Sequence, residues 1–383
     1  MIRIGIIGLG AAGEAFAGPM SRHEKVRLSA VCDLRADVRA EAAERFGVPV
    51  FDAIGDMLSG VDLDAVYVGT PTELHRPHAM QSIEAGLHVL LEKPMTVRPE
   101  DARAMVRAAE ARGLVLTVGH SHSHDAPVRA MREVVTSGRL GRARMLHNFC
   151  YSDWVYRPRR PEELRPELGG GVTFRQGAHQ FDILRALADD EVEAVSATLF
   201  DWDRARPTIG AHVVTLRFAG GAVGTAIYNG YGRFRSHELT GMIGEWGFPG
   251  RAGEAPPSPS GDEEAELERK RARAKGAIRN DAPHQPHFGL TLVSCEGGDI
   301  RQSPDGLLVY DADGCEEIRL PENRSPRDLV LDEFFEAVAG RPALHDGWWG
   351  ASIVEVCAAA HESSATGRPV PLGSARGPEV LMG

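Results

Sequence analysis

The chain has 383 residues, of which 43% are hydrophobic and 25% charged, the composition of an ordinary soluble globular protein. This length allows two domains with substantial cores. The formal net charge of −11 argues against nucleic acid as a partner, and no apolar run approaches a membrane span. The five cysteines contain no C-x-x-C pair, and no signal-peptide pattern precedes the first strand, so we expect a cytoplasmic protein without a disulfide framework.

The first 33 residues have the pattern of a dinucleotide-binding unit. An apolar run is followed by three glycines spaced G-x-G-x-x-G and by a helical stretch. Gly8 permits a tight turn, Gly10 lets the backbone approach a pyrophosphate, and Gly13 lets helix and strand pack closely. The free N–H groups at the start of the helix, at Ala11 and Ala12, would bind phosphate.

A second apolar run ends at Asp33, which lies 20 residues after Gly13. At this distance a carboxylate accepts hydrogen bonds from the adenosine ribose diol, which favours NAD over NADP. Leu34 and Arg35 follow it and complete this part of the predicted cofactor site. Arg35 is close enough in sequence to soften the preference for NAD, so NADP stays an alternative.

Strand and helix patterns alternate up to Gly119, which predicts a doubly wound parallel sheet. Such sheets bind ligands at the carboxyl ends of their strands. Two strand ends, after residues 65–68 and 88–91, add further candidates for cofactor binding: Thr70, Pro71, His75, Glu92 and Lys93. A lysine at a buried strand end beside a nicotinamide can also act as an acid or base.

The second half of the chain has a different pattern. Strand-like runs at 143–152, 192–200, 211–218, 222–228, 238–243, 290–295, 306–310 and 315–320 predict a large, mostly antiparallel sheet. Residues 249–286 are rich in Pro, Gly, Glu and Arg, and we expect a solvated helix or a mobile insertion there. The predicted organisation is an α/β Rossmann domain over residues 1–122 and an α+β domain over residues 123–383.

Four motifs together carry a resemblance to a known family: GLGAAG, TPTELH, the strand-end EKP, and GAHQFD after three glycines. This combination resembles the glucose–fructose oxidoreductase and inositol dehydrogenase (Gfo/Idh/MocA) family over nearly the whole chain. The resemblance implies an NAD(P)-dependent dehydrogenase without a metal, assembled as a homodimer or homotetramer. It also implies that Lys93 transfers the proton, that His179 shares this work, and that Asp182, on the same helix face, orients His179.

A closer similarity, over residues 119–184, is to the phthalate 4,5-cis-dihydrodiol dehydrogenase branch of that family. Many family members carry an acid four residues before the motif histidine, where this chain has Arg175. A guanidinium in place of that acid removes a hydrogen-bond acceptor for a polyol and provides a group that can bind a carboxylate through two N–H donors. Arg157 and Arg160, in a segment that also holds Tyr156, offer further carboxylate ligands. Alternatively, these arginines pair with the neighbouring acids Glu162, Glu163 and Glu167.

His120, His122 and His124 alternate, so in an extended segment they would share one face. We expect His120 and His122 to line the substrate pocket rather than to bind a metal, because no acid or cysteine completes a ligand set. The predicted reaction is hydride transfer from a ring CH–OH, with a cis-dihydrodiol carboxylate as the favoured substrate. The alternatives are a dehydrogenase of sugars, glycosides or cyclitols, and a catalytically silent NAD-binding sensor.

Overall fold

The computed structural model describes residues 1–258, 262–277, 282–321 and 324–376, and these form two compact units. The first unit contains Met1–His120, the C-terminal part of the helix α8 (Glu263–Ala277) and Arg327–Val354. The second unit contains most of the chain from Ser121 to Pro326 and the chain from Glu355 onward. Arg327–Val354, which the sequence pattern assigned to the second domain, is therefore part of the first unit.

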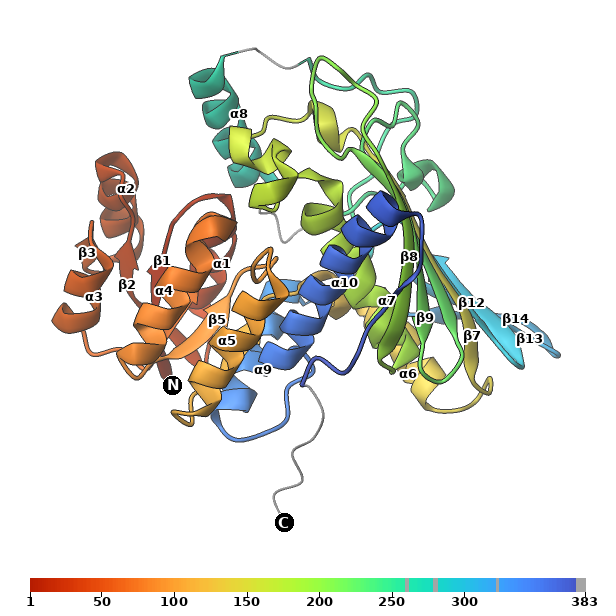
Figure 1. The fold of residues 1–383 in the computed structure, drawn as a ribbon, viewed down its shortest axis with the longest axis horizontal. Helices are drawn as coiled ribbons and strands as arrows, with labels where there is room; N and C mark the ends of the chain where they lie inside the picture. The colour runs from red at the N-terminus through yellow and green to blue at the C-terminus, as the bar shows by residue number, and fades with distance from the viewer. Residues whose placement is uncertain (259–261, 278–281, 322–323, 377–383) are drawn as a thin grey trace. The chain divides into compact units, whose positions relative to one another are not determined.

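The first unit is built on a six-stranded sheet of order β3-β2-β1-β4-β5-β6, in which every pair of neighbours is parallel (Figure 1). The strands are β1 (Ile2–Ile7), β2 (Val26–Cys32), β3 (Val50–Phe51), β4 (Ala65–Val68), β5 (His88–Leu91) and β6 (Leu116–Val118). The helices between them are α1 (Ala11–Arg22), α2 (Ala36–Phe46), α3 (Ile54–Gly60), α4 (Thr72–Glu84) and α5 (Pro99–Glu110). The predicted doubly wound parallel sheet is confirmed, and α3 is an element that the sequence pattern did not reveal.

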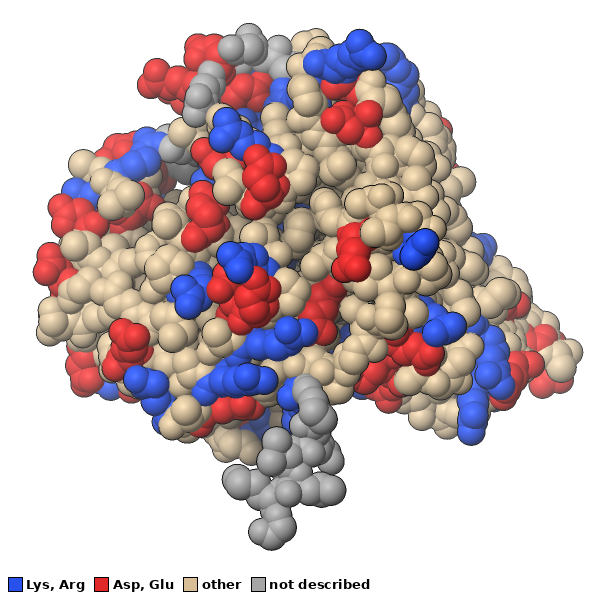
Figure 2. All heavy atoms as spheres, viewed as in Figure 1, with Lys and Arg blue, Asp and Glu red and all other residues tan. Residues whose placement is uncertain are grey.

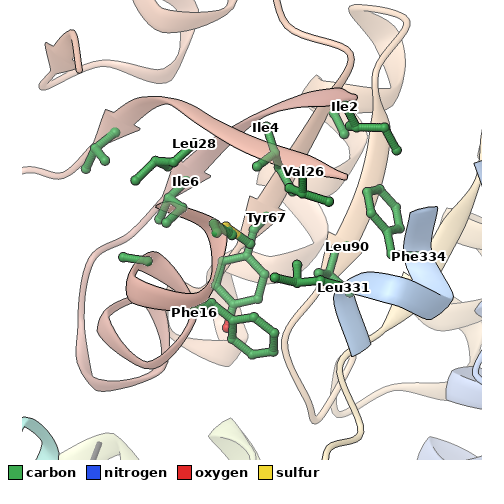
Figure 3. Close-up of a cluster of buried hydrophobic side chains, with 14 of the residues drawn as sticks. Ile2, Ile4, Ile6, Phe16, Val26, Leu28, Tyr67, Leu90, Leu331 and Phe334 are labelled. Carbon is green, nitrogen blue, oxygen red and sulfur yellow. The ribbon is translucent and has the colours of Figure 1, made fainter. Parts of the chain in front are cut away.

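The core of this unit joins residues that are far apart in the sequence. Ile4, Ile6, Phe16 and Tyr67 are almost fully buried and form one cluster with side chains of β2 and β5 (Figure 3). Leu331 and Phe334 of the helix α9 (Pro326–Val338) belong to the same cluster and are completely buried. Burial of such side chains stabilises by about 1.5–3 kcal/mol each, which explains why α9 is part of this unit.

The second unit is built on a nine-stranded sheet of order β14-β13-β12-β11-β7-β10-β9-β8-β15. Its strands are β7 (Ala143–Tyr151), β8 (Val192–Phe200), β9 (Ala211–Phe218), β10 (Val223–Asn229), β11 (Leu290–Cys295), β12 (Gly298–Ser303), β13 (Gly306–Asp311), β14 (Gly314–Arg319) and β15 (Val370–Pro371). The pair β7–β10 is parallel and the other pairs are antiparallel, as predicted.

Helices α6 (Ala126–Thr136) and α7 (Ala178–Ala188) pack on one face of this sheet. The hydroxyls of Ser363 and Ser364 in the last helix, α10 (Gly347–Thr366), accept hydrogen bonds from the Ala197 and Leu199 N–H groups of β8, both at 2.9 Å. These contacts hold the C-terminal part of α10 against β8, next to the short edge strand β15.

Two sequence predictions in the second unit are wrong. The strand expected at 238–243 is replaced by a 3-10 turn, Ser236–Leu239, because Gly241 and Met242 take left-handed φ angles of 65° and 66° that end any extended conformation. The strand β12 was missed, since its sequence GDIRQS has few β-branched or aromatic residues. The backbone hydrogen bonds to β11 and β13 stabilise the extended conformation that the local sequence does not favour.

The segment 249–286 contains α8 but is not fully solvated. Glu266 of α8 is buried, and its carboxylate accepts hydrogen bonds from the Arg159 N–H at 3.0 Å and from the Arg206 guanidinium at 3.1 Å. A buried ion pair of this kind anchors the helix to the second unit. Parts of the segment, residues 259–261 and 278–281, lie outside the described residues.

No described helix is long and apolar enough to cross a membrane. On the face drawn in Figure 2, basic and acidic side chains are interspersed rather than gathered into a patch of one sign. That face therefore offers no continuous basic surface.

Candidate active site

The glycine turn of the first unit has the geometry of a nucleotide-binding turn. Gly8, with φ +88°, ends β1, and its N–H donates to the Cys32 carbonyl at 2.8 Å. A Cβ at Gly13 would lie 2.2 Å from the Gly8 carbonyl oxygen, so only glycine fits there. A Cβ at Gly10 would meet nothing within 4 Å. The turn therefore leaves open space at Gly10, in front of the N–H groups of Ala11 and Ala12 at the start of α1, where an anion would be stabilised.

Asp33 lies directly beside this turn. One carboxylate oxygen accepts from the Leu9 N–H at 2.8 Å, and the other accepts from the Arg35 N–H at 2.9 Å. Leu34 is 84% exposed, and Arg35 forms an ion pair with Asp37. The glycine turn, the helix N-terminus and this fixed carboxylate fit a bound dinucleotide, with its pyrophosphate at Ala11 and Ala12 and its ribose diol at Asp33.

His75 connects two strand-end loops of the predicted cofactor site. It is buried in α4, where Nδ1 lies 3.0 Å from the Pro94 carbonyl and Nε2 lies 2.9 Å from the Thr70 carbonyl. Thr70 also packs against Gly8, and Pro71 is the N-cap of α4. The ring of His75 therefore lies between the backbone carbonyls of the two loops, and a neutral ring donates its one N–H to one of them.

Glu92 and Lys93 lie at the carboxyl end of β5. The Glu92 carboxylate accepts from the Tyr67 hydroxyl at 2.8 Å. Burial, together with the adjacent Glu92, raises the pKa of Tyr67 well above its usual value, so this hydroxyl remains a donor. Lys93 is half-buried and precedes a cis peptide bond to Pro94. The sequence did not identify Tyr67 as a partner of this loop, because it reads only as a buried strand residue.

In the second unit, His122 is held between two acids. It begins a 3-10 turn, His122–His124, so the extended segment predicted for the three histidines is not found. Nδ1 of His122 lies 2.8 Å from Asp125 Oδ2, and Nε2 lies 3.6 Å from Glu245 Oε1. Burial alone would lower the pKa of His122, but Asp125 and Glu245 outweigh it and raise the pKa to about 9. The reason for the turn is local, since Asp125 is the N-cap residue from which α6 starts.

His179 lies against His122. It is the second residue of α7, it is buried, and its ring centroid is 4.6 Å from that of His122 in an edge-to-face arrangement. Phe288 contacts both rings, at 4.4 Å from His122 and 5.1 Å from His179. Asp182 is completely buried one turn further along the same helix. Arg175 lies in the π-helical segment Thr173–Gly177 that leads into α7.

A chain of buried hydrogen bonds fixes α7 to the sheet. The Asn148 amide donates to the Phe288 carbonyl at 2.9 Å, so Asn148 Oδ1 accepts from Gln180 Nε2 at 2.6 Å. Gln180 Oε1 then accepts from His212 Nε2 at 2.8 Å, and His212 Nδ1 accepts from the Thr173 hydroxyl at 3.3 Å. The carbonyl at Phe288 thus orients Asn148 and Gln180, and His212 Nε2 is the donor at the end of the chain. Burial lowers the pKa of His212, so the ring is neutral and its Nδ1 faces the Thr173 hydroxyl as an acceptor.

Arg157 is engaged by acids that the sequence analysis did not name. Its Nε donates to Asp153 at 2.6 Å, and Nη1 lies 3.9 Å from Glu245. Arg235 shares Asp153, at 3.0 Å. Burial alone would raise the pKa of Asp153, but the two guanidinium groups outweigh burial and lower it. The alternative that some of the arginines pair with Glu162, Glu163 or Glu167 does not match the ion pairs that Arg157 forms among the described residues, because the fold brings Asp153 and Glu245 to it.

The remaining predicted residues occupy separate places. Arg160 donates its backbone N–H to Glu163 at 2.8 Å, and the Tyr156 ring lies 6.4 Å from that of Tyr231. His120 belongs to the first unit, where it is buried and contacts the His345 ring at 5.9 Å. His120 and His122 thus fall in different units, although they are two residues apart.

The sequence analysis missed Asp125, Glu245, Trp246 and Phe288, which surround His122. Asp125 carried a usable signal, since it is three residues from His122 and precedes a helix. No sequence pattern connects His122 with Glu245, Trp246 or Phe288, because only the packing of distant segments brings them together.

Two family models match the chain. One is described as the oxidoreductase family with an NAD-binding Rossmann fold and matches residues 2–120, and the other is the Gfo/Idh/MocA C-terminal domain and matches residues 128–245. The chain belongs to the Gfo/Idh/MocA oxidoreductase family. The predicted NAD(P)-dependent dehydrogenase is thereby confirmed at the level of the family, and so is its nicotinamide cofactor.

Named relatives agree with this membership. The chain is 37% identical to the 1-carboxy-3-chloro-3,4-dihydroxycyclohexa-1,5-diene dehydrogenase of Comamonas testosteroni, over 97% of this chain and 96% of that one. It is 34% identical to inositol 2-dehydrogenase 3 of Saccharopolyspora erythraea, over 50% of this chain and 55% of that one.

A solved structure from Bordetella bronchiseptica RB50, provisionally named a dehydrogenase, superimposes on the chain with a TM-score of 0.88. Its sequence is 39% identical, and the match covers 97% of this chain and 100% of that one. The whole described fold, and not only its nucleotide-binding part, is therefore that of this family.

Proposed function

We propose that the chain oxidises a ring CH–OH of a cyclic cis-diol that carries a carboxylate, with NAD as the hydride acceptor. The observation that carries this proposal is the similarity over nearly the whole length to the Comamonas testosteroni enzyme, whose name describes a carboxylated cyclohexadiene diol. This match covers 97% of the chain, whereas the matches to the sugar and inositol enzymes cover 38% and 50% of it.

NAD, when bound, supplies the carbon that accepts the hydride. Lys93, with His179, takes the hydroxyl proton as the C–H bond breaks, so that the alcohol becomes a ketone and one proton is released to the protein. A ketone formed from a cis-dihydrodiol enolises to a catechol, and aromatisation makes the oxidation favourable. Asp182 is the residue that we propose to orient His179 from within α7.

Arg175 is the residue that we propose to bind the substrate carboxylate, because it lies in the π-helical segment Thr173–Gly177 that leads into the helix of His179. Arg157 has a different role in this proposal. Its charge is already balanced by Asp153 and Glu245, so it supports the site rather than clamping a ligand. Arg160, Tyr156 and His120 remain candidates for further substrate contacts.

The test is to offer the enzyme a panel of substrates with NAD and to measure turnover of each by the nicotinamide absorbance at 340 nm. A carboxylated cis-dihydrodiol should be oxidised with NAD at a kcat/KM well above that of a neutral cis-dihydrodiol, myo-inositol or a glucoside. Arg175→Ala should mainly raise KM for the carboxylated diol and change the neutral diol little, because a clamp contributes mostly uniform binding. An unchanged KM for the carboxylated diol in Arg175→Ala would contradict the substrate assignment alone.

Lys93→Ala and His179→Ala should each lower turnover by roughly 10²–10⁴-fold, the usual contribution of acid–base catalysis, with NAD affinity almost unchanged. The double variant should lose less than the two single losses combined, because both residues act on one proton. Near-normal turnover of Lys93→Ala would overturn the mechanism.

A second candidate, oxidation of a sugar, glycoside or cyclitol, is favoured by the matches to 1,5-anhydro-D-fructose reductase, inositol 2-dehydrogenase and D-glucoside 3-dehydrogenase. These cover 38% to 52% of the chain, with identities of 42%, 34% and 33%. The same panel separates the two candidates. A silent NAD-binding sensor is the third, and its expected result is NAD binding without turnover on any member of the panel.

A further inference from the structure

Two buried histidines of the second unit, His122 and His179, are in direct contact. Their ring centroids are 4.6 Å apart and their planes are inclined by 81°. Two imidazolium charges this close, inside a protein, would repel each other strongly, so the pair favours a state in which only one ring carries a positive charge. Which ring carries it is decided by the charged groups around each.

The surroundings of His122 favour the positive charge on that ring. Its two nitrogens face two carboxylates, Asp125 at 2.8 Å and Glu245 at 3.6 Å, so each N–H of an imidazolium has an acceptor on its own side. A neutral ring would turn a lone pair toward one of these acids. The faces of Phe288, at 4.4 Å, and Trp246, at 5.4 Å, are further groups that stabilise a cation.

We propose that His122 is a buried imidazolium which, through its charge beside His179, keeps His179 unprotonated and therefore able to accept the substrate proton. His122 is a positioning residue in this proposal, because it acts through His179 and need not touch the reacting atoms. The proposal rests on the proposed function only for the role of His179. The raised pKa of His122, which follows from Asp125 and Glu245, agrees with the geometry.

The other charged groups near the pair fall on several elements. His124 lies on the same 3-10 turn, and Asp125 caps α6. Glu245 comes from the loop after the 3-10 turn Ser236–Leu239, and Arg157 lies 3.9 Å from its other carboxylate oxygen. Asp182, one turn beyond His179 on α7, is the acid that favours the opposite distribution, with the proton on His179. The experiment must therefore compare the two rings directly.

The first measurement is an NMR titration of the enzyme with NAD bound and its histidines labelled with ¹⁵N, between pH 5.5 and 8.5. His122→Gln and His179→Ala assign the two resonances, and His147→Gln on β7, whose ring contacts the Thr225 hydroxyl, is the matched control. Both nitrogens of His122 should stay protonated over the whole range, while His179 stays neutral down to at least the middle of it. A His122 ring that loses its proton below pH 7 overturns the proposal.

The second measurement is the pH dependence of kcat/KM. His122→Gln keeps a donor toward Asp125 but removes the charge, so two carboxylates near His179 lose their counter-ion. The acidic limb should then move to higher pH by about 1–2 units, the size expected of a charge at this distance in a partly screened site. His147→Gln should leave the limb in place.

A His122→Gln enzyme with lower turnover and an unchanged acidic limb would show that His122 acts only by packing, and the proposal would be wrong. Failure of this proposal can be distinguished from failure of the proposed function. If His179→Ala keeps normal turnover, His179 is not the proton acceptor and that part of the mechanism fails, whereas the NMR titration still decides which ring carries the charge.

Discussion

Gly10 and Gly13, three residues apart in one turn, need glycine for different reasons. At Gly13 a Cβ atom would lie 2.2 Å from the backbone carbonyl of Gly8, so glycine is needed there for the turn to fold. At Gly10 the space for a side chain is open and φ is an ordinary −76°, so the fold does not require glycine there. Glycine is needed at this position to leave room for the bound cofactor. The two positions therefore allow the stability of the turn and its cofactor affinity to be tested separately.

Gly13→Ala should lower the free energy of unfolding by about 1–3 kcal/mol, the usual cost of overpacking. Gly10→Ala should change it by no more than about 0.5 kcal/mol. The Gly10→Ala protein should nevertheless bind NAD at least about tenfold more weakly, because the methyl group enters the space of the pyrophosphate. Thermal unfolding without NAD and calorimetric titration with NAD measure the two effects. Normal NAD affinity in Gly10→Ala would contradict the placement of the pyrophosphate.

Asp33 controls the choice between NAD and NADP in our interpretation. Asp33→Asn keeps the shape of the side chain but removes the charge that repels a 2′-phosphate, so the Kd for NADP relative to NAD should fall by about tenfold or more. The matched control is Asp52→Asn, which removes one exposed carboxylate nearby and should leave the ratio unchanged. The role given to Asp33 is wrong if the wild-type protein binds NADP more tightly than NAD.

At the scale of elements, α7 depends on buried polar contacts rather than on an apolar stripe. Ten of its residues, from Ala178 to Leu187, are buried, including Gln180, Asp182 and Arg185. A helix buried on all sides must satisfy its polar groups internally, and the chain from Phe288 through Asn148 and Gln180 to His212 does so. The same contacts hold His179 in place, so local stability and the candidate site are linked through this helix.

This chain of hydrogen bonds predicts a sensitivity to acid. Burial lowers the pKa of His212 to about 3, from an ordinary value of 6.5. Between these values the unfolded chain binds a proton at this position and the folded protein does not, so the free energy of unfolding is largest above pH 6.5 and falls as the pH drops toward 3. The expected slope from this one group approaches about 1.4 kcal/mol per pH unit.

His212→Gln should remove that contribution and make the dependence of stability on pH less steep between about pH 6 and 4. Denaturant unfolding at several pH values measures the slope. His287 remains in both proteins, and burial lowers its pKa to about 4, so part of the acid sensitivity should persist. Equal slopes in the wild type and in His212→Gln would contradict the assignment of a neutral, buried His212.

At the scale of the whole molecule, the nine-stranded sheet suggests self-association. One face carries α6 and α7, and on the other face Met145, Val213 and Val223 are 50%, 41% and 37% exposed. Met145 and Val223 are register partners, and Val213 follows the same alternation as Arg217, the partner of Val223 on β9, so all three share one face. Apolar side chains gathered on a sheet are typical of an interface.

We expect a dimer or tetramer at micromolar concentration by light scattering, with a second copy on this face. Val213→Glu should shift the mass toward the monomer, because it would bury a charge in the interface. Leu239→Glu is the control, since Leu239 is similarly exposed, at 49%, but lies on the 3-10 turn Ser236–Leu239 outside the sheet. A monomeric wild-type protein would overturn this expectation.

Features that depend on neighbours along the chain could be predicted from the residues alone: the glycine turn, Asp33 at the end of β2, the loops after β4 and β5, and the helix that carries His179. Their signals are short-range, because turns, helix starts and strand ends are set by backbone preference and by local periodicity. The family resemblance in the same motifs then supplied the class of reaction.

The partners that surround these residues could not be predicted in this way, because many of them come from distant parts of the chain. Glu245 and Phe288 reach His122 from distant segments, Asp153 takes Arg157 in place of the nearby glutamates, and α9 joins the core of the first unit. These contacts are set by the packing of apolar faces and by the pairing of buried charges, which depend on distance in space rather than along the chain. The charge on His122 is of this kind, since no local pattern of residues contains both of its acids.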